Sequence, residues 1–288
     1  MRCVTGDMRI VRTVARVRDA VRGARSAGLT VGFVPTMGAL HEGHLSLLRR
    51  ARNQCGYVVL SVFVNPTQFN DPADLAAYPR DEASDARMAR EVRSDLFFAP
   101  GVSEMYPDGF ATAVVVSGLS EPLEGAVRGP AHFRGVATVV AKLFNIVAPD
   151  VAYFGQKDAQ QALVVRRLVT DLDFPLRVEV CPTVREADGL AMSSRNARLG
   201  PGDRPRALAL RRGLDAAEAA IAAGERDPGR VARAGSDAMR ALGVEPEYFA
   251  VVSADTLRPL DAVEDEVLIA VAARVGPVRL IDNVLLGV

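Results

Sequence analysis

The sequence has little of three things: cysteine, net charge of either sign and long apolar runs. Its three cysteines, Cys3, Cys55 and Cys181, lie far apart and form no CxxC pair. An odd number of scattered cysteines argues against a disulfide framework and favours a reducing compartment. The 35 basic residues balance the 35 acidic residues. This balance excludes the electrostatic field of one sign with which proteins attract nucleic acid or a membrane surface.

No apolar run is as long as a membrane span. The first residues, MRCVTGDMRIVRTVARVRD, carry charges every few positions and lack the apolar centre of a signal peptide. A chain of 288 residues can bury a sizeable core in one large or two unequal domains. We therefore expect a soluble, cytoplasmic, globular protein.

Lysine and histidine are also scarce, and both scarcities draw attention to particular positions. Lysine occurs only at Lys142 and Lys157, so nearly all 35 basic residues are arginine. A lysine retained against such a bias can mark a site where a compact ammonium group is preferred to a planar guanidinium. Two of the three histidines, His41 and His44, lie in the single stretch VPTMGALHEGHLSLLRR.

What the sequence does have, over its first two-thirds, is an alternation of short apolar runs with helical patterns. Alternating strands and helices predict an α/β fold with a Rossmann-like parallel sheet and helices on both faces. We assign this domain to residues 1–182. The expected strands are Leu29–Val34, Tyr57–Val64, Asp95–Ala99, Val151–Phe154 and Leu176–Val180, and the expected helices are His44–Cys55, Asp81–Val92, Gly135–Ile146 and Gln160–Leu172.

The pattern changes after about Pro182, where a long polar loop precedes two helices and then three strands. Helices followed by strands predict a smaller C-terminal α+β domain, which we assign to residues 183–288 and which carries the MSSR loop. Its expected helices are Pro205–Gly224 and Pro228–Leu242, and its expected strands are Glu247–Val252, Val267–Val275 and Val278–Leu286.

The histidine motif admits three interpretations: a zinc site, a phosphate site or local packing and capping. Pro35–Gly43 follows a predicted strand, and the next helix should begin at about His44. Ligands of open α/β sheets bind at this position, where a helix N-terminus offers unpaired N–H groups. Zinc fits poorly, because the i, i+3 spacing differs from HExxH and the remaining ligands form no recognisable set. Capping or packing stays open for the motif alone.

Three further polar loops adjoin predicted strands: NPTQFN (Asn65–Asn70), GQKDAQQ (Gly155–Gln161) and AMSSRN (Ala191–Asn196). Each alone is more typical of a turn or a cap than of a site. The chain has no GxxxxGK[ST] loop and no GxGxxG after a strand. Because the four loops should gather at or face one sheet edge, together they favour a ligand site.

Six stretches taken together resemble the pantothenate synthetase (pantoate–β-alanine ligase) family over nearly the whole chain. They are FVPTMGALHEGHLSL, FVNPTQF, YPRD, HFRGVATVV, FGQKDAQQ and PTVREADGLAMSSRN. The HxGH motif alone would indicate only the nucleotidyltransferase superfamily. One departure is RGPAH at Arg128–His132, where a shorter RPGH-like run is expected. Arg128 and His132 therefore receive no role.

The resemblance implies ATP-dependent condensation of (R)-pantoate with β-alanine to pantothenate. The reaction passes through pantoyl-adenylate and releases AMP and pyrophosphate. ATP is then a substrate, accompanied by Mg²⁺; no metal-binding residue of the protein is assigned, and a homodimer is expected. The alternative is an HxGH adenylyltransferase, whose phosphate acceptor would need additional cations. A second alternative is a module that binds ATP without turning it over.

The resemblance also assigns residues. The catalytic assignments are His41, His44, Lys157 and Arg195, with His44 donating a proton towards the phosphates. Asn65, Gln68 and Gln161 are assigned to pantoate and β-alanine. The ATP-binding assignments are Met37, Gly38, Ala39, Leu40, His41, Glu42, Gly43, His44, Gly155, Gln156, Lys157, Asp158, Val184, Met192, Ser193, Ser194 and Arg195.

Overall fold

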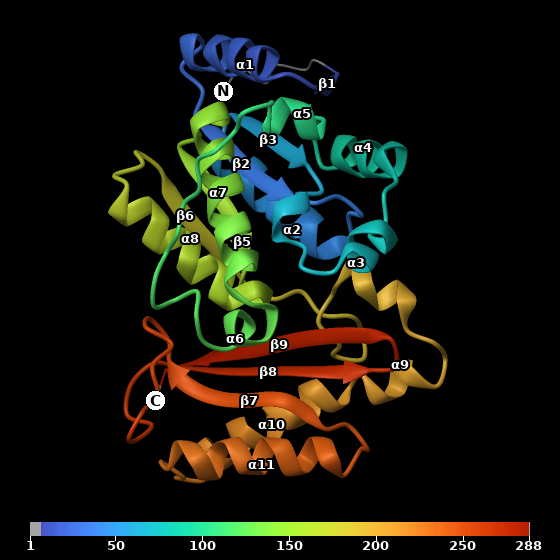
Figure 1. The fold of residues 1–288 in the computed structure, drawn as a ribbon, viewed down its shortest axis with the longest axis vertical. Coiled ribbons are helices and arrows are strands. Elements are labelled where there is room, and N and C mark those ends of the chain that lie inside the picture. Colours follow the sequence, from blue (N-terminus) through green and yellow to red (C-terminus); the bar gives the residue numbers. More distant parts are fainter. Residues whose placement is uncertain (1–6, 288) are drawn as a thin grey trace. The chain divides into compact units, whose positions relative to one another are not determined.

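The computed structural model describes residues 7–287, so Cys3 lies outside the described residues. The chain forms two compact units (Figure 1). Unit 1 comprises Met1–Gly155 and Gln161–Cys181, and unit 2 comprises Gln156–Gln160 and Pro182–Val288. Unit 2 is therefore discontinuous in sequence, because it includes a five-residue segment from within the first two-thirds of the chain.

Unit 1 is built on a six-stranded parallel sheet with the strand order β1-β4-β3-β2-β5-β6. Every neighbouring pair runs parallel, which confirms the predicted Rossmann-like α/β fold. The strands are β1 (Arg9–Val11), β2 (Val31–Thr36), β3 (Tyr57–Val62), β4 (Leu96–Phe98), β5 (Val151–Gly155) and β6 (Arg177–Cys181).

Helices cover both faces of this sheet. Alternate residues of each strand point to opposite sides, and the apolar side chains on both sides are buried against helices. Phe33 of β2 belongs to a core shared with α1, α7 and α8, whereas the next residue, Val34, belongs to a core shared with α2 and α4. The helices of unit 1 are α1 (Val14–Ser26), α2 (Glu42–Gln54), α3 (Pro72–Ala77), α4 (Glu82–Glu91), α5 (Val102–Met105), α6 (Glu124–Arg128), α7 (Pro130–Val147) and α8 (Ala159–Asp171).

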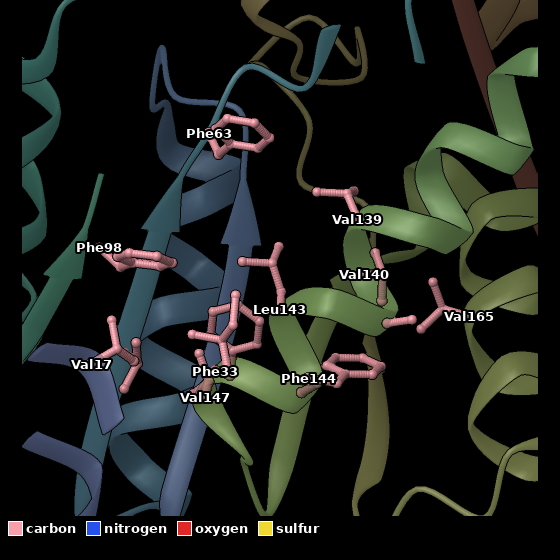
Figure 2. Packing of buried hydrophobic residues seen from close by; sticks show 14 of the residues in the cluster. Val17, Phe33, Phe63, Phe98, Val139, Val140, Leu143, Phe144, Val147 and Val165 are labelled. Carbon is pink, nitrogen blue, oxygen red and sulfur yellow. The ribbon is translucent and has the colours of Figure 1, made fainter. Parts of the chain in front are cut away.

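Helix α7 supplies much of the first core. Figure 2 shows Leu143, Phe144 and Val147 of α7 beside Phe33 of β2. Phe33 and Phe144 meet edge to face, with ring centroids 6.5 Å apart, an arrangement worth about 1 kcal/mol beyond the area it buries. The same helix contacts the NPTQ turn (Asn65–Gln68), because the carbonyl of Gly135 in α7 accepts a hydrogen bond from Asn65.

Several predicted boundaries in unit 1 are wrong for identifiable reasons. Helix α2 begins at Glu42, not at His44, because His41 acts as its N-cap. Helix α7 begins at Pro130, five residues before the predicted Gly135, because Gly129 turns the chain with a φ of 78° and Pro130 suits the first helical turn. Strand β1 and helix α1, which has Thr13 as its N-cap, were not predicted.

Unit 2 contains a three-stranded antiparallel sheet with the order β7-β8-β9, packed against α10 and α11. The smaller α+β fold is thereby confirmed. The predicted helix Pro205–Gly224 is interrupted, since α9 ends at Arg206 and α10 begins at Ala209. The elements are α9 (Asp203–Arg206), α10 (Ala209–Ala222), α11 (Pro228–Arg240), β7 (Pro246–Ser253), β8 (Val267–Val275) and β9 (Val278–Leu286). Across residues 7–287, no helix combines the length and apolar character needed to cross a bilayer.

Candidate active site

The order of the strands marks where a ligand would bind in unit 1. From β2 the chain proceeds outward through β3 on one side, whereas β5 lies against the other side of β2. The direction of winding therefore reverses between β2 and β5. In open α/β sheets, such a switch point forms the binding crevice at the carboxyl ends of the strands. The histidine motif follows β2, and Gln156–Asp158 follow β5 in the chain.

His41 and His44 cap helix α2 reciprocally. Nδ1 of His41 accepts a hydrogen bond from the Gly43 N–H (3.1 Å), and Nδ1 of His44 accepts one from the His41 N–H (3.3 Å). This arrangement is a capping box in which imidazoles replace the usual hydroxyl and carboxylate groups. The capping role that the sequence left open is therefore present.

Capping also determines the chemistry that the histidines can offer. An imidazole whose Nδ1 accepts a hydrogen bond carries its proton on Nε2 when neutral. The ring centroids of His41 and His44 are only 4.1 Å apart, so two imidazolium cations there would repel each other. The pair is therefore suited to present Nε2–H donors at a helix N-terminus, where anions are favoured.

The loop before α2 is held by a buried carboxylate. Asp85 of α4 is 2% exposed and accepts hydrogen bonds from the N–H groups of Ala39 (3.0 Å) and Leu40 (2.7 Å). Burial raises the pKa of Asp85, while the two N–H groups oppose that rise. Gly38 has a φ of +84°, and a Cβ there would lie 2.9 Å from the Asp85 carboxylate. The backbone of residues 38–40 can therefore approach Asp85 only with glycine at position 38.

The NPTQ turn after β3 brings two of the predicted amides together. Asn65 is 1% exposed and caps the short helix η1 (Pro66–Gln68), and its Nδ2 donates to Oε1 of Gln68 (3.0 Å). Nε2 of Gln68 lies 3.3 Å from the Met37 sulfur. Residues following β2 and β3 are thus in direct contact, as expected for neighbouring parallel strands.

Helix α7 and a tyrosine hold this turn in place. Oδ1 of Asn65 accepts from the Tyr106 hydroxyl (2.8 Å), and its Nδ2 also donates to the Gly135 carbonyl (3.2 Å). A Cβ at Gly135 would lie 2.4 Å from the Thr67 carbonyl oxygen. His132, which received no role from the sequence, has its Nδ1 2.8 Å from the Gln68 carbonyl oxygen.

In unit 2, the segment carrying Lys157 is a short helix, η2 (Gln156–Asp158). Nζ of Lys157 lies 3.3 Å from an Asp158 carboxylate oxygen, and the Lys157 side chain is 21% exposed. Asn283 of β9 donates hydrogen bonds to the carbonyls of Gln156 (3.0 Å) and Lys157 (2.9 Å). A partly exposed ammonium ion on a fixed backbone is suited to follow phosphate oxygens.

The other predicted ATP segments of unit 2 lie against each other. Val184 accepts a backbone hydrogen bond from Met192 (3.0 Å). Ser193 caps η3 (Ser194–Arg198) by accepting from the Arg195 N–H (3.3 Å). The MSSR residues therefore form one turn with Val184 beside it.

The remaining predicted residues are placed as follows. Glu42 begins α2 and forms an ion pair with Arg49 on the same helix. Gly155 ends β5, and Gln161 is the third residue of α8. Arg128, left without a role, pairs with the buried Glu124 one turn earlier on α6, at 2.7 Å. The association of Gln161 with Gln68 around one substrate stays a prediction.

Sequence reasoning missed Asp85, Tyr106 and Gly135. It also missed Asn283 and its neighbour Asp282, whose carboxylate accepts two hydrogen bonds from Arg185. Only Asp282 and Asn283 carried a recognisable signal, because an adjacent Asp and Asn interrupt the apolar strand VRLIDNVLL. The others act through contacts between distant parts of the chain. Within residues 7–287, no group of three or more His, Cys, Asp or Glu could hold a metal ion.

Known proteins resemble this chain over nearly its whole length. Residues 9–285 match the family described as Pantoate-beta-alanine ligase. The pantothenate synthetase of Moorella thermoacetica is 55% identical over 282 residues, which are 98% of this chain and 99% of that protein. The corresponding protein of Cereibacter sphaeroides is 55% identical over 276 residues, covering 96% and 98%.

Two solved structures are also similar. The pantothenate synthetase of Thermus thermophilus has a TM-score of 0.91 and 51% identity, covering 96% of this chain and 99% of that one. A pantoate-beta-alanine ligase from Francisella tularensis, described as complexed with Beta-gamma ATP and Beta-alanine, has a TM-score of 0.78 and 33% identity, covering 96% and 97%. By its sequence and its fold, the chain belongs to the pantoate–β-alanine ligase family.

Proposed function

We propose that the protein condenses pantoate with β-alanine to form pantothenate, consuming ATP and releasing AMP and pyrophosphate through a pantoyl-adenylate. The observation that carries this proposal is the HxGH capping box at the N-terminus of α2, next to the switch point, in a chain matching the family over residues 9–285. The related Francisella protein is described as complexed with Beta-gamma ATP and Beta-alanine.

The first half-reaction needs charge stabilisation more than covalent catalysis. The pantoate carboxylate attacks the α-phosphorus of ATP, and negative charge grows on the phosphoryl oxygens and the departing pyrophosphate. The Nε2–H donors of His41 and His44 suit those oxygens, and Lys157 and Arg195 neutralise the pyrophosphate. We assign the backbone of the remaining ATP-binding residues to positioning the nucleotide. No protein nucleophile is required.

The second half-reaction joins the activated pantoyl carbon to the amine of β-alanine. The amine attacks the carbonyl carbon, a tetrahedral intermediate forms, and AMP leaves. We assign Gln68 and Gln161 to holding pantoate and β-alanine, because amides both donate to and accept from hydroxyl groups without adding charge. We assign Asn65 to orienting Gln68, because both hydrogens of the buried Asn65 amide are already donated, to Gln68 and to the Gly135 carbonyl. Asn65 is itself held by Tyr106 and holds Gln68, so Gln68 needs little reordering on binding.

We propose that Mg²⁺ arrives with the triphosphate. Proteins hold Mg²⁺ through one or two carboxylates together with substrate phosphates and water. Asp158, whose side chain is 49% exposed beside Lys157, is a carboxylate of the kind that this arrangement needs. When bound, the ion would neutralise charge on the phosphate oxygens.

The adenylyltransferase alternative is not favoured. An acceptor phosphate would require additional cations near the α-phosphate, whereas the NPTQ turn offers the amide of Gln68, which Asn65 orients. A cytoplasmic location and a homodimer are part of the proposal. Sedimentation analysis of the purified protein tests the dimer, and a monomer at micromolar concentration contradicts it.

Pantoate alone should drive the exchange of labelled pyrophosphate into ATP, without β-alanine. Exchange requires a reversible first half-reaction, which a pantoyl-adenylate intermediate provides. AMP should accumulate over many turnovers only when both pantoate and β-alanine are added. Omitting each substrate in turn is the control, and sustained AMP formation without pantoate would contradict the proposed function.

The substitution Lys157→Arg should lower the rate of adenylation at least ~10-fold, about 1.4 kcal/mol of transition-state stabilisation. The charge is preserved, but a planar, longer guanidinium cannot follow the phosphate oxygens as a compact ammonium does. Lys142→Arg is the matched control. Nζ of Lys142 lies 4.5 Å from the Phe110 ring centroid, and arginine satisfies such a contact equally well. Pyrophosphate release is measured for both, and a Lys157→Arg enzyme as fast as wild type refutes the prediction.

A further inference from the structure

Two adjacent polar residues, Asp282 and Asn283, lie buried in the middle of β9. Asp282 is 3% exposed and Asn283 4%. The residues opposite them on β8 are the apolar Val271 and Ala270. Burying a carboxylate and an amide among such neighbours is costly unless their polar atoms are hydrogen-bonded. The partners of the two side chains therefore indicate their purpose.

Asn283 uses its whole amide on the segment that carries Lys157. Both hydrogens of Nδ2 are donated to main-chain carbonyls, those of Gln156 (3.0 Å) and Lys157 (2.9 Å). Oδ1 accepts from Nε2 of Gln156 (3.1 Å). The two carbonyls lie on either side of the Lys157 Cα. Asn283 thus fixes the direction in which the Lys157 side chain leaves the backbone.

Asp282 holds the segment that leads to the MSSR turn. Its two carboxylate oxygens accept from Nη1 and Nη2 of Arg185, at 2.6 and 3.0 Å, and bidentate pairs of this kind are strong and directional. Arg185 follows Val184, and it forms an isolated bridge with Ala191, immediately before Met192. The Asn283 N–H donates to Asp282 (2.8 Å), so the two anchors are themselves linked.

We propose that Asp282 and Asn283 are positioning residues that fix, from one strand, the Lys157 segment and the base of the MSSR turn for the ATP half-reaction. The proposal rests on the proposed function, because that function gives Lys157 and Arg195 their roles at the phosphates. A strand is a rigid support, and catalytic groups supported in this way keep their geometry without reordering when the nucleotide binds. If Asn283 served only the stability of β9, the effect of its replacement on catalysis would not depend on the presence of Lys157.

The test is a double-mutant cycle with Asn283→Asp and Lys157→Ala. Asn283→Asp places a carboxylate oxygen against the two carbonyls, so kcat/KM for ATP should fall about 10-fold. In the Lys157→Ala background the same change should have less than about a twofold effect, because its target is already gone. Full additivity would mean that Asn283 does not act through Lys157, and the proposal would fail.

Three controls separate positioning from stability and from the function itself. Asn145→Asp makes the same chemical change at an exposed position of α7, and Val271→Ala destabilises β8 opposite Asp282; neither should alter kcat/KM. Hydrogen–deuterium exchange of residues 156–158 should accelerate in Asn283→Asp, or in Asn283→Ala if the first variant does not fold. Unchanged exchange overturns the proposed anchoring. An inactive wild-type enzyme refutes the proposed function, while the exchange comparison still decides the anchoring.

Discussion

Replacing His44 with alanine should slow adenylation by roughly 10²–10³-fold, the scale for losing one donor aimed at developing charge. Because Nδ1 of His44 is committed to the His41 N–H, the side chain serves two purposes, one through each nitrogen. The substitution removes both. Pyrophosphate exchange driven by pantoate measures the catalytic loss, and the urea midpoint measures the loss of the cap, about 1 kcal/mol.

The variant His44→Asn separates the two purposes. Asparagine places Oδ1 near the position of Nδ1, so it can still accept from the His41 N–H, but it has nothing at the position of Nε2. Its stability should match wild type within about 0.5 kcal/mol, while its exchange rate should be as low as that of His44→Ala. If His44→Asn retains wild-type exchange, the motif is a cap and nothing more.

The substitution Gly135→Ala should lower the free energy of unfolding by about 3 kcal/mol and reduce kcat/KM at least ~10-fold. The added Cβ would lie 2.4 Å from the Thr67 carbonyl oxygen and 2.8 Å from the Gln68 backbone nitrogen. Neither neighbour is a flexible side-chain end, so α7 and the NPTQ turn must separate. That movement breaks the bond from Asn65 to the Gly135 carbonyl. Thermal unfolding and steady-state kinetics with varied pantoate measure the two effects.

Gly23→Ala is the matched control, because it makes the same chemical change within α1. Apart from the adjacent residues and the backbone of the same helix, no heavy atom lies within 4 Å of the position that a Cβ would take at Gly23. Alanine restricts the unfolded chain and favours the helix, so this variant should gain about 0.5–1 kcal/mol and keep wild-type kinetics. If both glycine variants behave alike, helix propensity and not the clash governs position 135.

The sequence was most informative where long, predominantly apolar runs were bounded by turn residues. The last two strands, Val267–Val275 and Val278–Leu286, agree with the prediction residue for residue. The first helix was missed because the charges spread over its exposed face obscured the buried stripe formed by Val17, Val21 and Ala24. Strand β1 has three residues, too few for any alternation to be recognised.

In the candidate site, too, features set by neighbouring residues were predictable, whereas contacts between residues far apart in the sequence were not. The loops after β2 and β3 follow predicted strands, so the contact between Met37 and Gln68 at one sheet edge could be anticipated. The residues that support the site loops could not be anticipated. Asp85 and Leu40 are 45 residues apart, and Asn283 and Gln156 are 127 apart, and no spacing in a single sequence pairs them. The start of α2 was misplaced because imidazoles are not among the usual N-caps.

The discontinuity of unit 2 limits how this protein could be divided or recombined. A fragment beginning at Pro182 lacks Gln156–Gln160 and leaves the buried amide of Asn283 without its three partners. A chimera joined at that junction would combine Asn283 from one parent with Gln156 and Lys157 from another. To take Asn283, Gln156 and Lys157 from the same parent, the crossover must lie before Gln156. The change in sequence pattern, by contrast, falls near Pro182. The unit of exchange between relatives is therefore larger than the C-terminal domain.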